Sequence, residues 1–208
     1  MSRFSFFLDL DDTVIKSKTH VASYLSNKYG VTIRPEDLVD NNGFHNTLNS
    51  HGVSVSYNEV YLDFGKNFFS SFSLQDFSLY PGAKEAIVSL SRFYNLYIVT
   101  SRQKNEKPYI EEILKYHEIL SCFRDIHCVW DWKDGSFVSE PKASFIEEKR
   151  KTEVGVCFVD DSVEEIQRIA KSNLVISRIL FDPQRSYPKE GIGFEVFNNW
   201  GQVKKMFA

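Results

Sequence analysis

The fold is decided near the start of the chain, where residues 4–14 read FSFFLDLDDTV. The apolar run at residues 4–8 is short and nearly continuous, which is typical of a strand buried on both faces of a sheet. Asp9 and Asp11 follow it directly, and side chains alternate along an extended chain, so both carboxylates can point the same way. Because ligands of open α/β sheets bind outside the carboxyl ends of the strands, this stretch predicts an acidic site at that edge.

Four more apolar runs follow, at residues 96–99, 126–129, 154–159 and 179–181. Apolar residues at helical spacing lie between or beside these runs, at residues 83–93, 108–114 and 163–170. Strands that alternate with helices favour parallel pairing with right-handed crossovers. The sequence therefore predicts an α/β fold, with a Rossmann-like parallel sheet flanked by helices.

Residues 16–80 break this alternation, since they contain helical stretches around 21–29 and 59–72 and no convincing strand. We therefore expect an α/β core formed by residues 1–15 and 81–208, with an inserted small helical cap formed by residues 16–80. Five phenylalanines crowd the second half of this block, and large aromatic side chains mostly serve cores. Packing within the cap is favoured over a surface that stacks on substrate. Whether these rings, His20 or His45 touch substrate is left open.

Charge and composition exclude several classes of protein. The net charge of −3 argues against a general nucleic-acid or membrane-surface binder, because both need clustered positive charge. No apolar run reaches the roughly 18 residues of a membrane span, and the N-terminal run is too short for a signal peptide. We expect a cytoplasmic protein. A zinc site at Cys122, His127 and Cys128 is disfavoured, since it lacks a fourth ligand and suitable spacing.

Further polar residues follow the other strands. Thr100 and Ser101 end the second apolar run and offer hydroxyls to a phosphate oxygen, and Lys142 can offset phosphate charge. Asp160 and Asp161 end the fourth run. Each of these residues has an alternative, purely structural role, because hydroxyls and carboxylates also cap helices and a lysine can simply carry surface charge. Together with Asp9 and Asp11, however, these carboxylates would repel one another, and a hard divalent cation such as Mg²⁺ would hold them.

The chain resembles the haloacid dehalogenase (HAD) superfamily. Four motifs carry the resemblance: FLDLDDTV at residues 7–14, YIVTS at 97–101, EPK at 140–142 and FVDDSVEE at 158–165. They span nearly the whole chain and are similar to those of a superfamily phosphatase with a helical C1-type cap. The tail, with ILFD at residues 179–182 and FNNW at 197–200, is similar to the 5'(3')-deoxyribonucleotidase-like branch.

The resemblance implies roles for these residues. Asp9 would be the nucleophile that becomes an aspartyl phosphate, and Asp11 would act first as general acid and then as base. The phosphoryl group would be held by Thr100, Ser101 and Lys142, and Mg²⁺ by Asp9, the backbone carbonyl of Asp11, and Asp161. Further support would come from Asp160, Glu165 and Thr13. Since Glu165 stands where many members have aspartate, and Asp160 where many have glycine, it is open whether Glu165 reaches the metal.

The expected function is Mg²⁺-dependent hydrolysis of a small soluble phosphate monoester, such as a nucleotide, a sugar phosphate or a phospho-acid. Asp11 favours a phosphatase over a dehalogenase, because cleavage of a carbon–halogen bond needs no acid for an alkoxide leaving group. Two alternatives stay open. A sugar-phosphate mutase would require a bisphosphate, and a non-catalytic phosphate-binding module would turn over no ester. The sequence indicates no oligomeric state.

Overall fold

The computed structural model describes residues 3–38, 43–172, 174–187 and 193–208. Within them lies a seven-stranded sheet with the strand order β4-β3-β2-β1-β5-β6-β7. Neighbouring strands are parallel, except that β3 and β4 form an antiparallel hairpin. The strands are β1 Arg3–Leu8, β2 Asn95–Gln103, β3 Phe123–Lys133, β4 Ser136–Ser139, β5 Glu153–Asp160, β6 Ser177–Phe181 and β7 Glu195–Phe197. The predicted α/β fold with a mostly parallel sheet is confirmed.

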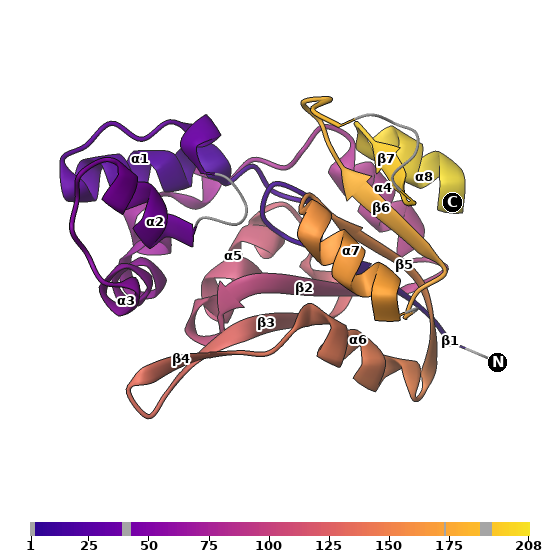
Figure 1. The fold of residues 1–208 in the computed structure, drawn as a ribbon. Coiled ribbons are helices and arrows are strands. Elements are labelled where there is room, and N and C mark those ends of the chain that lie inside the picture. Colours follow the sequence, from indigo (N-terminus) through magenta and orange to yellow (C-terminus); the bar gives the residue numbers. More distant parts are fainter. Residues whose placement is uncertain (1–2, 39–42, 173, 188–192) are drawn as a thin grey trace.

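Helices cover both faces of the sheet (Figure 1). One face packs on α4 Ala83–Leu90, α5 Lys107–Tyr116 and α8 Trp200–Phe207, and the other on α6 Lys142–Arg150 and α7 Val163–Ser172. Successive side chains of β1 enter opposite layers, with Phe6 and Leu8 in the first core and Phe7 in the second. This double burial explains why the central strands read as continuous apolar runs.

The block at residues 16–80 contains α1 Lys18–Tyr29, α2 Gly43–Ser50 and α3 Tyr57–Asn67. These helices gather beside the carboxyl ends of β1 and β2 (Figure 1). The expected helix at 59–72 ends at Asn67, and a short 3-10 turn follows at Phe69–Ser71. Phe68, Phe69 and Phe77 are buried and contact one another. That this block acts as a cap stays a prediction.

Two strands and three helices were not expected from the sequence, namely β4, β7, α2, α6 and α8. The hairpin that makes β4 turns at Asp134 and Gly135, both with positive φ (49° and 80°). Asp-Gly is a favoured pair for such a tight turn, so the signal was present in the sequence. Phe93 was placed on the apolar stripe of α4, but the helix ends at Leu90 and Phe93 is 64% exposed.

The C-terminal helix is fastened to the loop that follows β1. Trp200 is fully buried, and its Nε1 donates a hydrogen bond of 2.9 Å to the backbone carbonyl of Thr13. The tail thereby supports the loop that carries Asp9 and Asp11. In the described parts of the chain, no helix combines the length and apolar character needed to cross a membrane.

Candidate active site

A pocket of about 360 Å³ opens at the carboxyl ends of the strands, between the sheet and the helices of residues 16–80. The loop after β1 contributes Asp9 and Asp11, β2 contributes Ser101, α6 contributes Lys142, and the turn after β5 contributes Asp161. Residues that are far apart in the sequence thus meet at one edge of the sheet, as the strand-end argument predicted.

Lys142 bridges two buried carboxylates. Its Nζ donates to Asp9 Oδ1 at 2.6 Å and to Asp160 Oδ2 at 2.7 Å, and all three side chains are almost fully buried. Burial raises the pKa of Asp9 well above its usual range and the nearby carboxylates add to this, while Lys142 opposes it. Burial would lower the pKa of Lys142, but the two carboxylates outweigh it and raise that pKa. The charges of this trio therefore depend on one another.

Among the described residues, Asp9, Asp160 and Asp161 form a group that could hold a metal ion. One carboxylate oxygen from each lies within 4.8 Å of the others. Clustered carboxylate oxygens are the donors that Mg²⁺ prefers. The backbone N–H of Ser162 donates to Asp160 Oδ1 at 2.8 Å, so protein donors engage both oxygens of Asp160. The chemistry of these three carboxylates fits a divalent cation.

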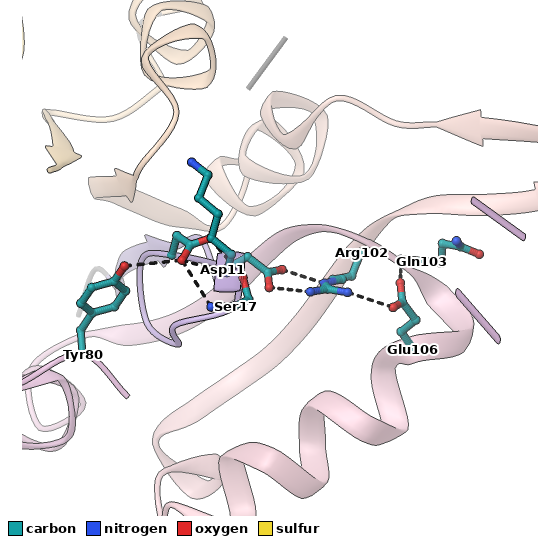
Figure 2. A network of polar contacts seen from close by, with 8 residues as sticks. Asp11, Ser17, Tyr80, Arg102, Gln103 and Glu106 are labelled. Carbon is teal, nitrogen blue, oxygen red and sulfur yellow. Dashed lines mark hydrogen bonds and ion pairs between the residues drawn. The ribbon is translucent and has the colours of Figure 1, made fainter. Parts of the chain in front are cut away.

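Asp11 lies in a separate polar network, drawn in Figure 2. Arg102 Nε and Nη2 donate to its two carboxylate oxygens at 2.8 and 2.7 Å, and Arg102 Nη1 donates to Glu106 Oε1 at 3.2 Å. Glu106 Oε2 accepts the backbone N–H of Gln103 at 2.8 Å. Burial raises the pKa of Asp11, but the charge and hydrogen bonds of Arg102 outweigh it and hold this pKa below its usual range.

Arg102 also connects the sheet to the helical block. Its guanidinium lies 4.6–5.1 Å from the ring centres of Phe64, Phe68 and Phe69. Next to it, Gln103 Nε2 donates to the carbonyl of Tyr61. A Cβ at Gly65 would lie 2.3 Å from the Gln103 side chain, so glycine permits this close approach. The end of β2 is thus docked against α3.

The structure does not bring every predicted residue to the pocket wall. Ser101 lines the pocket, whereas Thr100 is fully buried, is absent from the lining, and leaves its Oγ1 without a hydrogen-bond partner among the described residues. Thr13 is also fully buried, and its Oγ1 has no such partner either. Glu165 lines the pocket while accepting from Arg168 at 2.7 Å, and burial raises its pKa.

Sequence reasoning missed several lining residues. Arg102 lies two positions after Thr100 on the same strand, so a charged residue continuing an apolar strand was an available signal. Phe44, Tyr61 and Trp130 also line the pocket. They come from α2, α3 and β3, and nothing in the sequence indicates that these three elements meet.

The family assignment follows from the whole chain. Residues 6–176 match the model of the haloacid dehalogenase-like hydrolases. The chain belongs to this family. The prediction of a hydrolase enzyme from the HAD superfamily is thereby confirmed, while its C1 cap type and its place in a deoxyribonucleotidase-like branch stay predictions.

Several solved HAD structures share the fold across the full length of the chain. A Haemophilus somnus protein described as a predicted phosphoglycolate phosphatase is 17% identical with a TM-score of 0.68, and each chain is covered to 100%. A HAD-like family hydrolase from Streptococcus pneumoniae is 16% identical, with a TM-score of 0.67 and coverage of 100% and 99%. Bacillus subtilis YfnB, solved with magnesium bound, is 13% identical, with a TM-score of 0.64 and coverage of 99% and 98%. No curated protein matches the sequence.

Proposed function

We propose that this chain is a Mg²⁺-dependent phosphatase that hydrolyses a small soluble phosphate monoester through an aspartyl phosphate on Asp9. The observation that carries the proposal is the setting of Asp9. Its carboxylate lies buried at the pocket, bound by Lys142 at 2.6 Å and clustered with Asp160 and Asp161. Nucleophilic carboxylates of this kind split a difficult hydrolysis into two easier displacements. Its proposed location is the cytoplasm.

In the first displacement, an oxygen of Asp9 bonds to phosphorus, and the bond from phosphorus to the ester oxygen breaks. Asp11 gives its proton to the departing oxygen, which leaves as an alcohol. In the second, Asp11 takes a proton from water, the water oxygen bonds to phosphorus, and the bond to Asp9 breaks. Phosphate is released and Asp9 is regenerated.

Positive charge near the phosphoryl group supplies much of the catalysis in such reactions. Lys142 offers an ammonium beside Asp9, and Ser101 offers a hydroxyl from the neighbouring strand. We propose that these two groups orient the phosphoryl oxygens. Bound Mg²⁺, held by Asp9, Asp161 and the carbonyl of Asp11, would stabilise negative charge on those oxygens.

The hydrogen bonds around Asp11 suit its proposed role as a general base, but not its proposed role as a general acid. Because Arg102 holds Asp11 ionised, the conformation seen here suits acceptance of a proton from water. Donation to the leaving group requires that Asp11 first take up a proton and release at least one Arg102 hydrogen bond. The Arg102 pair is therefore part of the proposed acid–base cycle.

The test is phosphate release from a panel of nucleotides, sugar phosphates and phospho-acids, with Mg²⁺ and with chelator. We expect release that requires Mg²⁺, is abolished in Asp9→Asn and falls severely in Asp11→Asn. Glu164→Gln is the matched control, since it removes one negative charge from the pocket rim at a residue paired with Arg168. Release that needs a bisphosphate would favour a mutase. Absence of release from every ester would favour a binding module.

A further inference from the structure

The pocket has two chemically different halves. The half at the strand ends holds the carboxylates and Lys142. The apolar half comes from residues 16–80 and from β3, and is lined by Val21, Leu38, Phe44, Tyr61, Phe64 and Trp130. If the phosphoryl group lies at Asp9, the remainder of the substrate has to extend along these apolar side chains. The shape of this lining and the charges around it therefore determine which leaving groups can bind.

Three rings of the apolar half are nearly parallel. Phe44 and Tyr61 stack with centroids 5.2 Å apart and 12° between their planes, and Tyr61 and Trp130 with centroids 5.9 Å apart and 5° between planes. All three are only partly buried and all line the pocket. We call these three residues the aromatic wall. Because it combines α2, α3 and the β3–β4 hairpin, it exists only when these elements are assembled.

The pocket has little positive charge to spare. Its described lining contains eight acidic side chains and three basic ones. Two carboxylates engage Lys142, and two engage Arg102. The third, Lys18, lies next to Asp12, whose carboxylate accepts the Lys18 backbone N–H at 3.3 Å. A second anionic group on the substrate would thus lose its hydration in a lining where acidic side chains outnumber basic ones, which is costly.

From these two observations, we propose that the leaving group of the substrate is uncharged and carries a flat ring system that packs against the aromatic wall. The proposal rests on the phosphatase function, since it describes the other end of the same substrate. A pocket of about 360 Å³ falls within the range of small-molecule sites. A leaving group with a carboxylate, such as that of phosphoglycolate, is disfavoured by the surrounding acidic groups.

The test compares monoesters of primary alcohols that differ in what the alcohol carries. We expect kcat/KM to be highest for 2-phenylethyl phosphate, lower for 2-cyclohexylethyl phosphate and ethyl phosphate, and lowest for 2-phosphoglycolate. Trp130→Leu should lower kcat/KM for the phenyl ester by about 3- to 10-fold, which is the range expected for loss of one aromatic contact. It should leave ethyl phosphate within about twofold, since that contact is missing there.

Trp132→Leu is the matched control, because Trp132 lies on the same strand and contacts Phe137 but does not line the pocket. Phe44→Leu repeats the test from α2 should Trp130→Leu fail to fold. Preference for phosphoglycolate, or an equal loss for ethyl and phenylethyl phosphate in both wall variants, would overturn the proposal.

Failure of the phosphatase function would be recognised separately, by absence of turnover with every ester. In that case, calorimetric measurement of how tightly each ester binds to Asp9→Asn still tests whether the leaving group packs against the aromatic wall. Tighter binding of phenylethyl phosphate than of ethyl phosphate, weakened by Trp130→Leu and not by Trp132→Leu, supports the aromatic wall. Equal binding of the two esters refutes it.

Discussion

Arg102 binds both carboxylate oxygens of Asp11 and turns its remaining nitrogen toward Glu106. Glu106 is buried, and burial raises its pKa despite the opposing charge of Arg102. The same guanidinium lies against three phenylalanine rings of the helical block. One side chain thus joins the proposed acid–base residue, the end of β2 and the residues around α3.

Arg102→Met should therefore be both less stable and less active. Breaking a buried ion pair leaves an uncompensated carboxylate at Glu106, and such losses cost about 3–5 kcal/mol of unfolding free energy. Turnover should fall by about 10-fold or more, because Asp11 loses the donors that orient it. Urea unfolding and steady-state kinetics measure the two effects.

Lys104→Met is the control for Arg102→Met, since Lys104 lies two residues further on and pairs with Asp131 at the surface. Exposed pairs contribute about 0–1 kcal/mol, so this variant should stay close to the parent protein. If Arg102→Met loses no more stability than Lys104→Met, the network around Asp11 is not important for folding.

Lys142→Met should unfold more easily and lose most of its activity. It leaves the buried carboxylates of Asp9 and Asp160 facing each other without their shared cation, at a cost of about 3–5 kcal/mol. Unfolding is best measured with chelator present, so that no metal replaces the ammonium. Lys151→Met, at the exposed end of the same helix, serves as the control. Equal stability of the two variants would contradict the bridging role of Lys142.

His127 should make the protein lose stability in mild acid. Burial lowers its pKa although Glu140 and Asp125 raise it, and its ring stacks on Phe145 at 4.2 Å between centroids. Because its folded-state pKa lies below the unfolded value of about 6.5, the unfolded chain binds the proton more readily. Stability is then lost as the pH falls through about 6.5 toward the lower folded-state pKa.

His127→Gln should weaken this dependence of stability on pH. The prediction is tested by measuring the urea midpoints of the parent protein and of the variant between about pH 7.5 and 5. The difference between their two pH dependences gives the contribution of His127 alone, because the other histidines are present in both proteins. If both proteins show the same loss of stability over this range, His127 is not the group responsible.

Trp200→Phe should destabilise the protein through the loop that carries Asp9 and Asp11. The variant removes the indole N–H that binds the buried carbonyl of Thr13, and an unsatisfied buried acceptor costs about 1–3 kcal/mol. Thermal unfolding measures the loss, and Trp132→Phe on the exposed hairpin is the comparison. Equal unfolding temperatures for the two variants would show that the tail does not support this loop.

Much of the fold could be predicted because its central strands are buried on both faces. Double burial made β1 and β5 continuous apolar runs, and the polar residues that end them marked the site. The edge strands β4 and β7 have no such signal, since β4 is largely exposed and β7 has three residues. The periodicity that placed Phe93 on α4 continued past the end of that helix, where the chain turns into β2.

The candidate site was predictable where it depends on strand ends and not where it depends on contacts between distant elements. Asp9 and Asp161 lie together as their positions at strand ends suggested, and Lys142, expected there from the order of the family motifs, lies with them. The aromatic wall could not be inferred, because Phe44, Tyr61 and Trp130 meet only through tertiary packing. Thr100 and Ser101 were predicted alike, yet Ser101 lines the pocket whereas Thr100 is fully buried and does not.

The most direct test of the proposed chemistry is capture of the phosphorylated enzyme. Protein mixed with Mg²⁺ and a turned-over monoester would be quenched in acid within the first turnovers, and the peptide that contains Asp9 examined by mass spectrometry. We predict a phosphoryl group on Asp9 that hydroxylamine removes, and that is absent from Asp9→Asn and from the chelator-treated protein. Phosphate release at normal rates with Asp9 unmodified at every quench time, or retained in Asp9→Asn, would contradict the proposal that Asp9 is the nucleophile.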